Sequence, residues 1–193
     1  ALGQSKMFDR PIAAVLHLFL YVGFIIINIE VVEILIDGIF GTHRFLAHYV
    51  NNTIYNILIG SFEILAFLVF FSCIIFLIRR NVIRLKRFFS KEMTSWPKTD
   101  ANLILVFEIL LMGAFLSMNA ADGLLQSRNI DHYIIAGSFP VSQFITPIFS
   151  PLSSENLILL ERFCWWFHIL GILGFMNYVL FSKHLHIFFA FPS

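Results

Sequence analysis

Long apolar stretches alternate with short polar connections along this chain. The four apolar stretches cover residues 11–40, 54–78, 101–125 and 157–189. Each is longer than the roughly 20 residues that a helix needs to cross a bilayer, and a segment in lipid must satisfy its own backbone hydrogen bonds. The pattern therefore predicts an all-α fold. We expect a polytopic transmembrane helical bundle with four spanning helices, forming a single domain over residues 1–193.

The composition agrees with a chain whose surroundings are membrane lipid. Of the 193 residues, 59% are hydrophobic and only 13% are charged, which is unusual for soluble domains. The first residues lack the arrangement of a signal peptide, so the first stretch is expected to be a genuine span. No glycine-rich phosphate loop is present, and the net charge of +1 gives no sign of nucleic-acid binding. Cys73 and Cys164 lie in different apolar stretches and predict neither a disulfide framework nor a cysteine-ligated cluster.

Positively charged residues are distributed unevenly among the connections. Only Arg44, Arg128 and Arg162 of the 13 Lys and Arg residues lie on one side of the predicted bundle. The others lie in the N-terminal segment, in the connection between the second and third stretches, and in the tail. Because Lys and Arg favour cytoplasmic connections, both termini of this segment are expected in the cytoplasm. The outer connection, residues 131–154, is rich in Pro, Ser and Phe and is expected to be an ordered cap over the helix ends.

Histidines inside the apolar stretches are the strongest indication of chemistry. His168 and His186 are 18 residues apart, which is five helical turns, so they share one face at a separation of ~27 Å. His17 is expected at the level of His186, because the first and last spans run in opposite directions. Two histidines on facing helices are how a bundle holds haem iron, and we predict His17 and His186 as such a pair. A histidine in a membrane can equally serve as a hydrogen-bonding residue between helices.

His168 predicts a second haem near the outer surface, so the expected cofactor is haem b, one or two per chain. The partner of His168 is less clear. If helical throughout, the 26 residues from His17 to His43 would span ~39 Å and place His43 beyond the level of His168. A bend near Gly38 and Gly41 would bring His43 level, and His43 is therefore the candidate for the fourth ligand.

Acidic residues also lie in or near the predicted spans. They are Glu30, Glu33, Glu63 and Glu108. Ionisable residues within a membrane are candidates for proton delivery, for example to a quinone. An alternative of equal weight is that they only pair with nearby polar groups, as Glu33 and Asp37 would if they meet Arg44.

Four segments resemble one family. They are KMFDRP at residues 6–11, IDGIFGTHR at 36–44, KEMTSWPK at 91–98 and FCWWFHILGILGFMNYVLFSKHLHIFFAFPS at 163–193. Together they resemble the membrane domain of bacterial (Fe-S)-binding proteins related to heterodisulfide reductase, which in turn resemble the gamma subunit of respiratory nitrate reductase. That subunit has the same 18-residue histidine spacing, and the resemblance implies that His168 and His186 are haem b ligands. The resemblance to the nitrate reductase subunit fails at Ile27. The early helix of that subunit has two histidines ten residues apart, and Ile27 stands at the position of the second one.

The resemblance also implies a function. A protein of this kind is a cytochrome b-type electron-transfer subunit of the bacterial inner (cytoplasmic) membrane, linking menaquinone or ubiquinone to a cytoplasmic iron-sulfur or flavoprotein partner. In that family a further helix usually precedes this segment. A domain carrying an iron-sulfur cluster would follow residue 193, or the cluster would lie on a partner chain. The alternative from another class is a haem-free membrane anchor or scaffold subunit of a respiratory complex.

Overall fold

The computed structural model describes residues 11–83 and 96–179, and every regular element in these two ranges is helical. The long helices are α1 (Pro11–Phe40), α2 (Asn52–Asn81), α3 (Trp96–Ser127) and α5 (Ser154–Val179). Shorter helical turns are η2 (Phe45–His48), η5 (Ser142–Phe144) and α4 (Thr146–Phe149). The prediction of an all-α fold is confirmed for this part of the chain.

Three of the long helices are long and apolar enough to cross a membrane. Within the described part of the chain they are Asn52–Asn81, Thr99–Ser127 and Ser154–Tyr178. Helix α1 has 30 residues and covers the predicted first stretch, but many of its side chains lie outside the described part, so a fourth span stays a prediction. The last predicted stretch extends to residue 189, and its end also lies outside the described residues.

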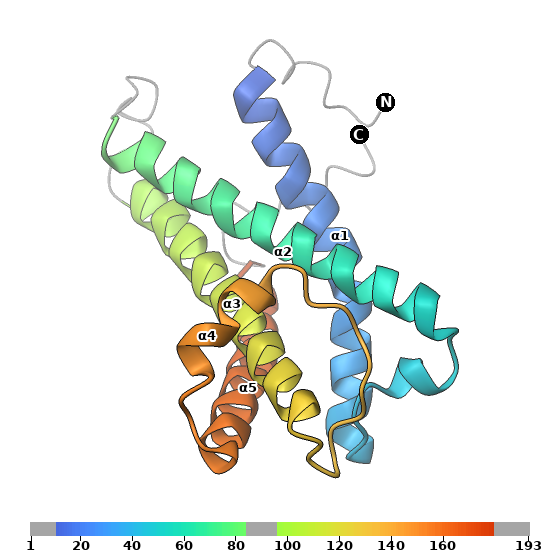
Figure 1. The fold of residues 1–193 in the computed structure, drawn as a ribbon. Coiled ribbons are helices and arrows are strands. Elements are labelled where there is room, and N and C mark those ends of the chain that lie inside the picture. Colours follow the sequence, from blue (N-terminus) through green and yellow to red (C-terminus); the bar gives the residue numbers. More distant parts are fainter. Residues whose placement is uncertain (1–10, 84–95, 180–193) are drawn as a thin grey trace.

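The four long helices run alternately in opposite directions (Figure 1). Helix α3 packs against both α2 and α5, while α1 packs mainly on α2. Side chains tie three helix ends together: the amide of Asn102 donates to Asn81 at 3.0 Å, and the hydroxyl of Tyr178 donates to Asp100. We call this the inner end, after the predicted orientation, and the opposite end, where α3 stops at Ser127, the outer end. The alternating order agrees with the predicted bundle.

A left-handed turn ends α1 at the outer end. Helix α1 stops at Phe40, and Gly41 has a φ of +65°, a conformation that glycine adopts at little cost. The carboxylate of Asp37 then accepts hydrogen bonds from the backbone N–H groups of Arg44 and Phe45, at 2.9 and 3.0 Å. The predicted bend near Gly38 and Gly41 is therefore present as the end of the helix, and it turns the following residues back over the bundle.

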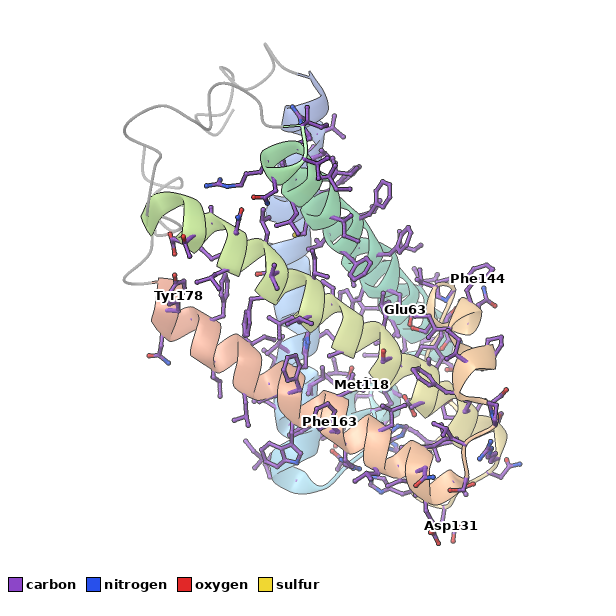
Figure 2. The ribbon with its side chains drawn as sticks, turned by 90° about the vertical axis from the view of Figure 1, so that its left-hand side faces the viewer. Glu63, Met118, Asp131, Phe144, Phe163 and Tyr178 are labelled. Carbon is purple, nitrogen blue, oxygen red and sulfur yellow. The ribbon has the colours of Figure 1, made fainter. Side chains whose placement is uncertain are left out.

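The outer connection is ordered, as predicted, but it enters the bundle instead of only capping it. The N–H of Gly137 donates to the side chain of Asn56 at 2.9 Å, and the hydroxyl of Ser142 donates to the carbonyl of Leu116 at 2.9 Å. Leu116 lies eleven residues before the end of α3, about 16 Å along the helix. Figure 2 shows Glu63 beside this segment and Phe144 on the side of the segment that faces away from the helices.

The main apolar core lies where α2, α3 and α5 meet the outer half of α1. It includes Ile34, Ala66, Phe115 and Ile169. Trp165 approaches α1 so closely that a Cβ on Gly38 would overlap the six-membered ring of the indole. Gly38 is therefore the residue that lets α5 reach α1 at this level, although the two helices pack mainly on α2 and α3.

Candidate functional site: a buried histidine and the outer polar network

His168 is buried in α5 with one ring nitrogen unused. Its side chain is 1% exposed, and its Nδ1 lies 3.1 Å from the carbonyl oxygen of Leu111 on α3. Because a carbonyl only accepts, Nδ1 carries the hydrogen, and Nε2 keeps its lone pair. Nε2 has no hydrogen-bond partner among the described residues. An Nδ1–H bonded to a carbonyl with Nε2 left available is the arrangement of metal-ligating histidines.

Helices α3 and α5 come together tightly beside His168. Gly171 lies three residues further along α5, and a Cβ placed on it would lie 2.5 Å from Cδ2 of Leu111. The ring of Phe115 covers His168 at a centroid distance of 5.6 Å. These contacts fix the ring orientation of His168, so the unused Nε2 is a property of a well-packed site.

The other predicted haem ligands are described less completely. His17 lies in α1, but its side chain is outside the described part, and His186 lies beyond the described residues. His43 follows the end of α1. Its Nε2 donates to Oδ1 of Asp122 at 2.9 Å, and its Nδ1 accepts from the N–H of Ile134 at 3.2 Å. The structure therefore brings His43 to α3 and the outer connection, and ligation of iron by His43 stays a prediction that requires a change of partner.

Arg44 is the centre of a buried polar network at the outer end. Its guanidinium donates to Oδ2 of Asp122 from Nε at 3.1 Å and from Nη2 at 2.7 Å, and to Asn119 at 3.0 Å. The ring of Phe139 lies over the guanidinium, with its centroid 5.3 Å away. Burial lowers the pKa of Arg44, but Asp122, Tyr55 and Glu30 together outweigh it and hold the pKa well above its usual range. Arg44 is therefore a permanent buried charge.

Two of the candidate acids have complete sets of structural partners. Glu63 accepts from the side chain of Asn119, from the N–H groups of Val141 and Ser142, and from the hydroxyl of Ser142, at 2.5–3.1 Å. Glu33 accepts from the N–H of Leu46 and the hydroxyl of Tyr55, both at 3.0 Å. These acids hold the two outer connections against the helices, which favours the structural alternative for them.

Glu30 differs from these acids because none of the described residues donates a hydrogen bond to it. Its side chain is 1% exposed, and its two carboxylate oxygens have no hydrogen-bond partner within residues 11–83 and 96–179. Its nearest cationic group is Nη1 of Arg44, 3.7 Å from Oε1. Glu108, the fourth predicted acid, lies in α3 and is half-buried.

The polar network reaches the outer surface through a second group of residues. The rings of His43 and the exposed His132 lie 5.8 Å apart. Nε2 of His132 is 3.1 Å from Nη2 of Arg162, whose Nε pairs with Glu161 at 3.2 Å. Burial and then the charge of Arg162 lower the pKa of His132. Side chains from the connection after α1, from α3, from the outer connection and from α5 thus link the buried charge of Arg44 to the outer surface.

Sequence reasoning missed the α3 side of this network. The missed residues are Asn119, Asp122 and Gln126, three polar positions near the end of α3. Their spacing of three and four residues puts them on one helical face, and this was the signal that could have identified them. Within residues 11–83 and 96–179, as far as their side chains are described, no group of three or more His, Cys, Asp or Glu is arranged to hold a metal ion. A haem iron, by contrast, needs only two protein side chains as ligands.

Two curated proteins are similar to this chain over almost its whole length. One is the probable iron-sulfur-binding oxidoreductase FadF of Bacillus subtilis (strain 168), 25% identical over 189 residues, which are 96% of this chain and 24% of FadF. The other is the EtfAB:quinone oxidoreductase of Syntrophomonas wolfei, 27% identical over 192 residues, 96% of this chain and 25% of that protein. This chain is a distant relative of iron-sulfur oxidoreductases. It spans about a quarter of the length of these relatives. No protein-family profile and no solved structure matches it.

Proposed function

We propose that this chain is the haem b-binding membrane segment of a quinone-linked electron-transfer oxidoreductase in a bacterial inner membrane. The names of the two relatives support the iron-sulfur and quinone parts of this proposal, and the apolar helices support the membrane part. In this proposal α1 is the fourth span and both ends of the segment face the cytoplasm. Electrons pass between menaquinone or ubiquinone and an iron-sulfur or flavin partner on the cytoplasmic side. The iron-sulfur cluster lies after residue 193 or on a partner chain.

The unused Nε2 of His168 is the observation that carries the haem proposal. A buried polar atom without a partner is costly in a membrane protein, where no water is available to satisfy it. The bond from Nδ1 to Leu111 already fixes the tautomer and the ring orientation, so Nε2 would be available to hold a haem iron. Bound haem b would supply a one-electron carrier. The histidines of this chain would hold the iron, and the apolar side chains around them would keep water away from it.

The contact between Gly38 and Trp165 supports His17 and His186 as the other axial pair. His17 lies 21 residues before Gly38, and His186 lies 21 residues after Trp165. Because α1 and α5 run in opposite directions, two straight helices in contact at Gly38 and Trp165 would bring these histidines to the same level. The fourth apolar stretch predicted from the sequence, residues 157–189, includes His186. One imidazole from each helix would then hold a haem near the inner end.

A second haem at His168 would need another ligand near the outer end. His43 is the candidate, and taking this role would release its bonds to Asp122 and Ile134. A hydrogen bond to a charged group contributes roughly 1.5–3 kcal/mol, so iron ligation has to outweigh that loss. The number of haems per chain therefore depends on whether His43 changes its partners when haem binds.

A reduced-minus-oxidised absorption spectrum of the purified intact protein tests the proposed function. We expect a b-type α-band in the spectrum, and we expect His168→Ala to diminish or shift it if the outer haem is present. The competing function, a haem-free membrane anchor, is favoured by the two hydrogen bonds that already occupy His43. It predicts no α-band in a preparation made with ample haem, and that result would overturn our proposal.

A further inference from the structure

Most of the outer connection has no charged side chain. Between Asp131 and Glu155, residues 133–154 contain no Asp, Glu, Lys or Arg. About a quarter of the residues in soluble domains are charged, and charged side chains are costly inside a bilayer. The composition of this connection therefore resembles that of the apolar helices more than that of a loop in water.

The middle of the connection, residues 137–150, lies well inside the outer helix ends, and we call it the re-entrant segment. The hydroxyl oxygen of Ser142 lies 2.9 Å from the carbonyl oxygen of Leu116 and 2.5 Å from Oε1 of Glu63. Leu116 is eleven residues before the last residue of α3, and Glu63 is eleven residues after the first residue of α2. Eleven residues are about 16 Å along a helix. Two neighbouring helices thus give the same depth for Ser142.

This depth falls within the hydrocarbon layer of a bilayer that α2 and α3 span. With 30 and 32 residues, the two helices are each roughly 45 Å long, whereas the hydrocarbon layer is about 30 Å thick. Centred helices therefore extend about 7 Å beyond the layer at each end, and a depth of about 16 Å lies in the half of the layer nearer the outer end. Figure 2 shows Phe144 nearer the level of Glu63 than that of Asp131.

The polar groups of the re-entrant segment bond within the protein. The N–H groups of Val141 and Ser142 donate to Glu63 at 2.9 and 3.1 Å, and the next three N–H groups donate to backbone carbonyls of the segment. The exposed side chains of Gln143 and Ser150 also donate to backbone carbonyls of the segment, at 2.8 and 2.9 Å. Non-helical backbone is tolerated at membrane depth where protein groups satisfy it. These groups meet that condition without water.

The outward side of the re-entrant segment is apolar. Phe144 and Ile148 are 78% and 70% exposed, and Figure 2 shows Phe144 on the side that faces away from the helices. Ile64 and Phe67, which follow Glu63 on α2, are exposed as well, and they belong to a helix that is apolar enough to span a membrane. Large apolar side chains are therefore exposed on the segment and on the helix beside it at a similar level.

We propose that the re-entrant segment inserts into the bilayer leaflet around the outer end, with Phe144 and Ile148 among the acyl chains of phospholipids. This inference rests on the membrane part of the proposed function and needs neither haem nor quinone. It also gives Glu63 a specific role. From a spanning helix, Glu63 supplies the acceptor for two backbone N–H groups that would otherwise be unsatisfied in lipid.

The test attaches a bimane fluorophore to single introduced cysteines in the intact protein, reconstituted in phosphatidylcholine liposomes. Cys73 and Cys164 are buried, so the wild-type protein taken through the same labelling is the blank. Phosphatidylcholine brominated on its acyl chains quenches a fluorophore in lipid, and iodide quenches one in water. We expect the label on Phe144→Cys and on Ile148→Cys to lose fluorescence in brominated liposomes and to keep it when iodide is added.

Two control positions separate this inference from the proposed function. The label on Phe67→Cys, in the middle of α2, should be quenched by brominated lipid, and the label on Asp131→Cys should be quenched by iodide. Quenching of Phe144→Cys by iodide alone would place the segment in water and overturn the inference. Quenching by neither agent would mean that protein covers this side, for example a second copy of the chain, and would also overturn it. Quenching of Phe67→Cys by iodide alone would overturn the membrane part of the proposed function, and this inference with it.

Discussion

At the scale of single residues, spacing identified a buried histidine, whereas the network around Arg44 depends on the fold. His168 stands out because an imidazole within an apolar stretch needs a partner, and the described residues give a partner to only one of its two nitrogens. The sequence predicts that Arg44 lies in the connection after the first apolar stretch. Arg44 is buried because it binds Asp122, which is 78 residues away in the chain. No local sequence pattern predicts this contact.

The buried pair of Arg44 and Asp122 predicts a large effect on stability. Arg44→Met removes the cation and leaves Asp122 charged in the interior, which costs about 3–5 kcal/mol when one partner of a buried pair is lost. The control is Arg162→Met, since the side chain of Arg162 is 41% exposed, and losing its pair with Glu161 is expected to cost less than losing a pair that is buried on both sides. Thermal unfolding in detergent measures both variants. Equal losses of stability in the two variants would show that Arg44 is not buried as described.

At the scale of elements, hydrophobic patterning located the long helices but not the path of the outer connection. The predicted second and third stretches, 54–78 and 101–125, lie inside α2 and α3, which extend further by polar residues at their ends. The connection between α3 and α5 enters the bundle because Glu63 offers its carboxylate to the backbone N–H groups of Val141 and Ser142. A pattern of apolar residues cannot predict hydrogen bonds between a carboxylate and the backbone of a segment far away in the sequence.

The approach of α5 to α1 depends on the absence of a side chain at Gly38. Gly38→Ala would place a methyl group on the ring of Trp165, and overpacking of this kind costs about 1–3 kcal/mol. Trp165→Phe removes the second ring, so the double variant Gly38→Ala/Trp165→Phe should recover part of the loss. Thermal unfolding of the single and double variants measures this coupling. Strictly additive effects would mean that the two residues are not in contact.

At the scale of the whole molecule, the alternating helix directions connect the sequence to the function. The order of the spans follows from four apolar stretches joined by connections, and the structure agrees with it where it is described. The level of each histidine could not be derived from span order alone, because α1 bends away after Phe40 and α2 crosses the bundle at a tilt. The contact between Gly38 and Trp165 sets the level of α1 against α5 within the described residues. The haem between His17 and His186 stays a proposal that depends on this level.

The haem-to-protein ratio of the purified intact protein, obtained as pyridine haemochrome against protein mass, tests the central claim most directly. We predict at least one haem b per chain. His17→Ala and His186→Ala should lower the ratio by the same amount, and the double variant should lower it no further, because both changes empty one site. His48→Ala, an exposed histidine in η2, should keep the wild-type ratio. A wild-type ratio near zero, or a His17→Ala protein with full haem content and an unchanged low-spin spectrum, would contradict the account.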